Sequence, residues 1–112
     1  MSTISWSDFE KIDIRSGTII DVKDFPEARK PTYQLWIDFC PALGIKKSSA
    51  QVTVHYRKED PLNRTIIAIV NFPPKQIARF VSECLVLGIY DENNDVILLN
   101  ADKPVSNGQR IG

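Results

Sequence analysis

Residues 12–22 read IDIRSGTIIDV, a stretch whose side chains are spaced for an extended strand. Successive side chains of a strand point to opposite faces, so every second residue of this stretch shares one face. Gly17 lies near its middle, where a strand that bends into a barrel needs a residue without a side chain. We therefore predict a long, curved strand with one face made of Ile12, Ile14, Ser16, Thr18, Ile20 and Val22.

Three stretches downstream also have strand patterns. The segment FPEARKP at 25–31 interrupts pairing, because each of its prolines removes a hydrogen-bond donor. Apolar and polar residues then alternate over 33–39 and again over 49–56, which predicts two half-buried strands. Residues 65–71 form a nearly continuous apolar run, which predicts a strand buried on both faces.

The C-terminal third begins with a rigid break, FPP at 72–74. Residues 75–80 are predicted to form one helical turn, and 85–90 an apolar strand. The acidic and amide side chains of 91–95 indicate a hairpin loop, from which a strand over 96–99 returns.

A short helix is expected at the N terminus. Ser5 with Asp8, or Ser7 with Glu10, has the spacing of a capping box. About six strands, little helix and regular turns are typical of a small barrel. We therefore predict an all-β chain with one domain over 1–112, a five-stranded Greek-key OB barrel with a short N-terminal helix and terminal extensions.

The composition is that of a soluble globular chain. The 112 residues are 43% hydrophobic and 25% charged, values that are ordinary for one domain with a single core. The longest aliphatic run, 66–70, is too short to span a bilayer, and the N terminus has no signal-peptide pattern. These features predict a cytoplasmic protein without membrane insertion.

The net charge is zero, but the charges are unevenly distributed. Residues 27–79 contain nine lysines and arginines against four acidic residues, a net charge of +5. The flanking segments carry −2 over 1–26 and −3 over 80–112. A basic middle favours an anionic partner on one face, although a solvated mixed surface fits the charges equally well.

The residues needed for catalysis are not found together. The single histidine, His55, is expected on the polar face of a strand, and Ser48–Ser49 lacks the frame of a nucleophilic serine. Cys40 and Cys84 are far apart and are expected to be reduced packing residues. One histidine and two separate cysteines do not make a zinc site, so we expect no enzyme activity, metal or cofactor.

Binding features are more informative. Trp36 shares the polar face of its strand with Gln34 and Asp38, where an aromatic ring stacks on a base, holds an apolar partner or lies under another element. Lys46–Lys47 and Arg29–Lys30 place paired cations at expected strand ends, where OB barrels commonly contact polynucleotides.

Five segments, in order along the chain, strongly resemble the CsaA family. They are DIRSGTI at 13–19, FPEARKP at 25–31, KSSAQVT at 47–53, VNFPPKQI at 70–77 and SECLVLG at 82–88. CsaA proteins are small export-related chaperones of the tRNA-binding-domain superfamily, which includes the C-terminal module of methionyl-tRNA synthetases and the EMAP-II domain. The resemblance implies an OB barrel, a non-catalytic homodimer and binding of tRNA or structured RNA.

The resemblance also implies an alternative ligand, an unfolded or export-bound polypeptide held in apolar pockets. It carries over Asn71, Lys75 and Ser82 as binding residues, although Asn71 and Ser82 would also suit hydrogen bonding to turn backbone. For polypeptide, we expect apolar hollows near Trp36, Phe72 and Phe80. The residues expected to contact RNA are Arg29, Lys30, Lys46, Lys47, Ser49, Gln51, Asn71, Lys75, Arg79 and Ser82.

Overall fold

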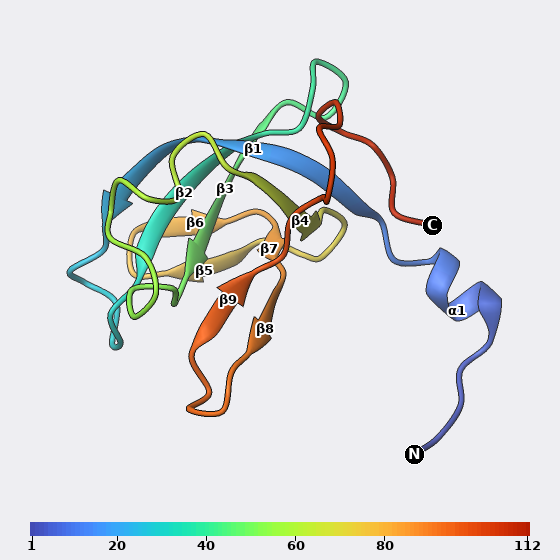
Figure 1. The fold of residues 1–112 in the computed structure, drawn as a ribbon, viewed down its shortest axis with the longest axis horizontal. Coiled ribbons are helices and arrows are strands. Elements are labelled where there is room, and N and C mark those ends of the chain that lie inside the picture. The colour runs from blue at the N-terminus through green and yellow to red at the C-terminus, as the bar shows by residue number, and fades with distance from the viewer.

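The first strand, β1, is long and curved and pairs along both of its edges (Figure 1). The computed structural model describes residues 1–112. Five antiparallel strands follow the order β3-β2-β1-β4-β7, and the hairpins β5–β6 and β8–β9 accompany them, which confirms the predicted OB-like barrel. The elements are α1 Trp6–Glu10, β1 Ile14–Asp24, β2 Tyr33–Asp38, β3 Ile45–Ala50, β4 Thr65–Ile69, β5 Lys75–Ile77, β6 Phe80–Ser82, β7 Leu85–Val86, β8 Gly88–Tyr90 and β9 Val96–Leu98.

The face that β1 turns toward the core changes along its length. Ile19 pairs with Ile37 of β2, and the register then skips Ile20, which forms a bulge. Ile19 and Val22 are consequently buried, whereas Ile20 is 42% exposed. The prediction of a single face over 12–22 was therefore wrong at Val22, because the inserted residue reverses the alternation and turns Val22 toward the core while Ile20 stays on the outer face.

Gly17 is the point at which β1 passes closest to the core. A Cβ atom at this position would lie 2.7 Å from Ile37 Cγ2 and 2.8 Å from two ring atoms of Phe39. Both neighbours are fully buried, so neither has space into which to move. The bare backbone of Gly17 lets the curved strand pack directly on these side chains, as the sequence predicts.

We expect Gly17→Ala to lower the free energy of unfolding by about 1–3 kcal/mol, because the added methyl group overpacks the core. Urea denaturation of the two proteins measures the difference. Gly112→Ala is the control, since a Cβ there meets nothing within 4 Å. Equal stability of the Gly17 variant and the control would contradict this expectation, because it would show that the core rearranges to accommodate the methyl group.

The barrel is closed between β3 and the β6–β7 connection by a seam of backbone and side-chain hydrogen bonds. Glu83 N–H donates to Lys47 O at 2.7 Å, and Glu83 Oε1 accepts from Lys47 N–H at 3.0 Å. Ser49 N–H donates to Ser82 Oγ at 3.3 Å. The seam holds β6 beside β3, and both strands then border the site described below.

Residues 75–80 form the hairpin β5–β6, and the predicted helical turn was wrong. Ile77 pairs with Phe80, so Ala78 and Arg79 make a two-residue loop. Ala78 has φ 52°, the left-handed conformation that tight hairpin turns require. Alanine carries no turn signal, and pairing with the neighbouring strand decides the conformation.

Two other predicted strands are shorter than expected. The strand expected over 49–56 ends with β3, and 53–55 form a turn, so that Val52 is buried while Val54 is 67% exposed. The strand expected over 85–90 is divided between β7, in the five-stranded sheet, and β8, in a separate hairpin.

The local predictions at the two ends of the chain are confirmed. Ser5 Oγ accepts from Asp8 N–H and the Asp8 carboxylate accepts from Ser5 N–H, both at 3.1 Å, so the capping box of α1 forms in the first of the two expected frames. The polar loop 91–95 joins β8 to β9 as a hairpin. The helix α1 has five residues, and the chain contains no helix that could span a bilayer.

Candidate nucleic-acid interface

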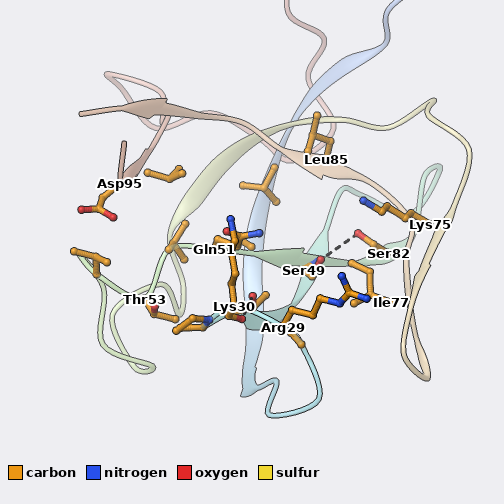
Figure 2. A pocket seen from close by; sticks show the side chains of 18 of the residues that line it. Arg29, Lys30, Ser49, Gln51, Thr53, Lys75, Ile77, Ser82, Leu85 and Asp95 are labelled. Atoms are coloured by element: carbon orange, nitrogen blue, oxygen red, sulfur yellow. Dashed lines mark hydrogen bonds between the residues drawn. The ribbon is translucent and has the colours of Figure 1, made fainter. Parts of the chain in front are cut away.

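A groove of about 1070 Å³ opens on one face of the molecule (Figure 2). One wall is the loop after β1, over 27–32, and the floor is the end of β3 with the residues that continue it, 49–54. Hairpins β5–β6 and β8–β9, with β7 between them, complete the walls. Segments distant in sequence therefore meet here because the barrel seam brings β6 to β3.

Three cationic side chains line this groove: Arg29, Lys30 and Lys75. All three are exposed, and none forms an ion pair with a carboxylate of the chain. Lys75 is the first residue of β5, whereas Arg29 and Lys30 belong to the proline-bounded loop between β1 and β2. Glu27 and Asp95 also line the groove, but neither forms an ion pair with these three cations, which leaves them free to bind an anion.

Six of the ten residues predicted to contact RNA line the groove, and four do not. The six are Arg29, Lys30, Ser49, Gln51, Lys75 and Ser82. Lys46 and Lys47 lie within β3 rather than at a strand end, and Lys47 Nζ lies 5.3 Å from the centre of the Phe80 ring. The role of these two lysines and of Arg79 in RNA binding stays a prediction.

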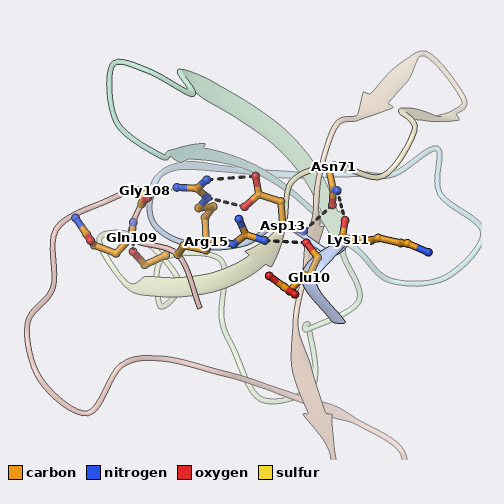
Figure 3. A network of polar contacts seen from close by, with 9 residues as sticks. Glu10, Lys11, Asp13, Arg15, Asn71, Gly108 and Gln109 are labelled. Atoms are coloured by element: carbon orange, nitrogen blue, oxygen red, sulfur yellow. Dashed lines mark hydrogen bonds and ion pairs between the residues drawn. The ribbon is translucent and has the colours of Figure 1, made fainter. Parts of the chain in front are cut away.

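Asn71, the fourth of these outlying residues, fastens the N-terminal arm to the barrel (Figure 3). Its Oδ1 accepts from Asp13 N–H at 2.9 Å, and its Nδ2 donates to Lys11 O at 2.7 Å. Beside it, Arg15 donates to the Asp13 carboxylate at 2.6 Å and to Gly108 O at 3.0 Å. Asn71 therefore satisfies backbone groups, one of the two roles considered from the sequence.

Ser82 satisfies backbone groups, as one of its two expected roles requires, and its role in binding stays a prediction. Its hydroxyl accepts from Ser49 N–H and lies 3.3 Å from Cys84 O, to which it donates. The residue also lines the groove next to Lys75, its partner across the hairpin. Ser82 thus fixes the position of the strand that presents this lysine.

The aromatic residues predicted for polypeptide binding do not form one hollow. Phe80 is buried, and its ring packs 5.9 Å from Trp36, edge to face, and 5.4 Å from Phe25. Trp36 is thereby covered by another element, one of the three interpretations left open. Phe72 is 49% exposed and lines neither this cluster nor the groove.

The end of the groove opposite Lys75 is lined by apolar side chains and a carboxylate, and no sequence pattern predicted these residues as part of a site. Val54 and Tyr90 are 67% and 71% exposed and line it together with Asp95. Tyr90 ends β8, where no sequence signal separates a surface ring from a core ring. The polarity of the groove, cationic at one side and carboxylate-bearing at the other, follows from the hairpin β8–β9.

His55 contacts the hairpin loop that forms one wall of the groove, and it does not line the groove itself. Its Nε2 lies 2.7 Å from Asp91 Oδ2, and Asp91 Oδ1 accepts from the N–H groups of Asn93 and Asp95. The Asp95 N–H, followed by His55, lowers the pKa of Asp91 below its usual 3.8. Ligand atoms of His55, Asp91 and Asp95 lie within 4.8 Å, a donor set that transition metals accept, but Asp91 is already engaged in shaping the turn.

We expect His55→Ala to change tRNA affinity less than about threefold, since a lost surface contact costs under about 1 kcal/mol. As the pH falls, the variant should begin to lose stability at a higher pH than the unmodified chain, because without His55 the pKa of Asp91 is lowered less. A lowered carboxylate pKa contributes stability above the unfolded value of 3.8 and loses it as pH falls through the folded value. Urea denaturation between about pH 5 and pH 3 measures this loss. A large fall in tRNA affinity would give His55 a direct role in binding.

Both cysteines are free thiols that pack against neighbouring residues, as the sequence predicts. Cys84 is 6% exposed, and burial raises the pKa of its thiol to about 12. A thiol that stays protonated is a poor nucleophile and a poor metal ligand. Cys40 packs against the turn at Gly108, where a Cβ atom would lie 2.6 Å from its sulfur.

Comparison with known proteins shows the family to which this chain belongs. Residues 14–110 match the family described as "Putative tRNA binding domain". The methionine–tRNA ligase of Nanoarchaeum equitans is 36% identical over 110 residues, which are 96% of this chain but only 13% of the ligase. This chain therefore spans about a seventh of the length of such relatives.

Two crystal structures match over the full length. The CsaA chaperone protein of Picrophilus torridus is 51% identical with a TM-score of 0.92, covering 98% of this chain and all of that one. The chaperone CsaA of Bacillus anthracis is 45% identical with a TM-score of 0.93, covering 99% and 100%. The five segments identified in the sequence lie within these matched regions.

Proposed function

This chain belongs to the tRNA-binding-domain family and, within it, to the CsaA group, and from this premise we propose that it binds tRNA in the groove without catalysing a reaction. The observation that carries the proposal is the meeting of Arg29, Lys30 and Lys75 in one groove, where none of them forms an ion pair. Unpaired cations release the counterions of a phosphate backbone when they bind it. The hydroxyl and amide groups of Ser49 and Gln51 supply further donors for phosphate and sugar oxygens.

The absence of catalysis is proposed from the placement of the reactive groups. The single imidazole is held against Asp91 on the outside of the groove wall. The hydroxyl of Ser82 is engaged with backbone groups, and no base lies beside it. A serine without an adjacent base is a weak nucleophile, so binding is the chemistry that this groove supports.

A second candidate function is binding of unfolded or export-bound polypeptides in the cytoplasm. It is favoured by the exposed apolar side chains of Val54, Leu85 and Tyr90 in the same groove and by the full-length likeness to proteins named chaperones. Extended polypeptides bind such surfaces through apolar side chains, with little dependence on salt. The two ligands would then compete for one groove.

Titration with tRNA and with an unfolded polypeptide at two salt concentrations tests the proposal. We expect tRNA affinity to fall steeply as salt rises, because each phosphate contact releases counterions. Polypeptide affinity should change little. Salt-independent tRNA binding, or binding of polypeptide alone, would overturn the tRNA-binding proposal and favour the chaperone function.

We also propose that the chain forms a homodimer through its N-terminal arm. Helix α1 buries none of its residues and lies away from the strands (Figure 1). Trp6 is 68% exposed, and its ring lies beside that of Phe9, with ring centres 5.3 Å apart. A second copy would cover this apolar surface in a twofold arrangement.

Light scattering at micromolar concentration tests this proposal. We expect a particle of twice 12.7 kDa, and a monomer for Trp6→Glu, which places a charge in the proposed interface. The Val105→Glu variant, which makes the same change of charge at another exposed apolar residue, is the control. A 12.7 kDa particle for the unmodified chain would exclude the dimer.

A further inference from the structure

The walls of the groove suit unpaired RNA better than a duplex. Nearly half of its lining residues are apolar, among them Val54, Leu85 and Tyr90. An A-form duplex stacks its bases inside and presents phosphates and sugars, which cannot cover apolar walls. An unpaired nucleotide can turn its base toward the protein while its phosphates remain with the cations.

The two sides of the groove separate the two parts of a nucleotide. Lys75 and Ser82 lie on one side, with Arg29 and Lys30 near the middle, while Asp95 lies across from them (Figure 2). A carboxylate repels phosphate and accepts hydrogen bonds from a base. The phosphates therefore belong with the cations and the base with Asp95.

Tyr90 and Asp95 flank the hairpin loop that forms this end of the groove. The Tyr90 ring is 71% exposed and packs on no other aromatic ring, so it is available for stacking on a base. The Asp95 carboxylate makes no hydrogen bond or ion pair within the chain. The backbone N–H of Asp95 donates to Asp91 Oδ1, which holds the residue in the loop. The loop thus presents a stacking surface and a bidentate acceptor on a rigid frame.

The chemistry of the base edges selects guanine. Guanine has two adjacent donors, N1–H and the N2 amine, which match the two oxygens of a carboxylate. Adenine and cytosine place a lone-pair acceptor beside their amine, and uracil flanks its N3–H with two carbonyl oxygens, all of which repel a carboxylate. Resting on the proposed tRNA-binding function, we propose that the groove receives an unpaired guanosine of the RNA, its base stacked on Tyr90 and hydrogen-bonded to Asp95.

Uridine heptamers with one central guanosine, inosine or adenosine test this proposal by fluorescence anisotropy. Inosine lacks the N2 amine and keeps N1–H, so it isolates one of the two hydrogen bonds. We expect the guanosine heptamer to bind about 10-fold more tightly than the adenosine heptamer, with inosine between them, because only guanosine makes the bidentate contact. A hairpin that pairs the same guanosine should lose this advantage.

Asp95→Asn should remove the preference for guanosine, and the exposed Asp102→Asn should preserve it. Tyr90→Ala should weaken all three heptamers by about fivefold or more through lost stacking, whereas Tyr90→Phe should not. Circular dichroism and the melting temperature confirm that each variant is folded.

Equal affinity for the three heptamers, or a guanosine preference that survives Asp95→Asn, would overturn this inference while salt-dependent tRNA binding still stands. If tRNA itself binds without salt dependence, the proposed function fails and this inference fails with it.

Discussion

Replacing Arg29, Lys30 and Lys75 together with alanine should lower tRNA affinity by about 100-fold. Each exposed cation near a phosphate is worth about 1 kcal/mol at the dielectric constant of water, and three such contacts are removed. The plot of log affinity against log salt should flatten by about two to three units, since each lost contact removes about 0.7–0.9. Titrations of tRNA over a salt series measure both quantities.

A matched control removes three cations elsewhere: Lys11, Lys58 and Lys103. Lys11 and Lys58 lie 3.6 Å from carboxylates of Asp8 and Asp24, and none of the three lines the groove. The control has the same net charge as the groove variant, so a difference between them reports position. Similar losses in both variants would mean that overall charge, and not the groove, attracts the RNA.

Replacing Phe39 with alanine should have the largest effect on stability. Phe39 is the largest of the fully buried side chains, and its ring packs beneath Gly17. Its removal leaves a cavity, and we expect the free energy of unfolding to fall by about 3–5 kcal/mol. Urea denaturation, with the midpoint and slope compared between variants, measures this loss.

Phe72→Ala is the control for this substitution, because the same chemical change is made on a side chain that is 49% exposed. Its cost should stay under about 1 kcal/mol. Equal losses in the two variants would contradict the placement of Phe39 at the centre of the core.

The parts of the fold that depend on local pattern could be predicted from the sequence. The alternation over 33–39 and the glycine at 17 each have a direct physical cause, a half-buried strand and a close approach to the core. The bulge at Ile20 and the hairpin at Ala78 could not be predicted, since both are set by pairing with a neighbouring strand. Tertiary pairing decides such positions against local preference.

The candidate site was predictable where the charge of a residue alone indicates its role. Arg29, Lys30 and Lys75 meet in the groove as a set, although two chain segments supply them. Lys46 and Lys47 were expected at a strand end, but β3 extends through them. Tyr90 and Asp95 were missed because their position depends on where the hairpin β8–β9 folds relative to β3, which no short sequence pattern specifies.

Acetylation of lysines in the presence and absence of tRNA, followed by mass spectrometry, tests the central claim most directly. The chain offers exposed lysines inside the groove, Lys30 and Lys75, and others outside it, Lys11 and Lys103. If tRNA occupies the groove, it should protect the first pair from acetylation at low salt and leave the second pair as reactive as in the free protein. Protection of Lys11 and Lys103, with Lys30 and Lys75 still fully reactive, would contradict the placement of tRNA in this groove.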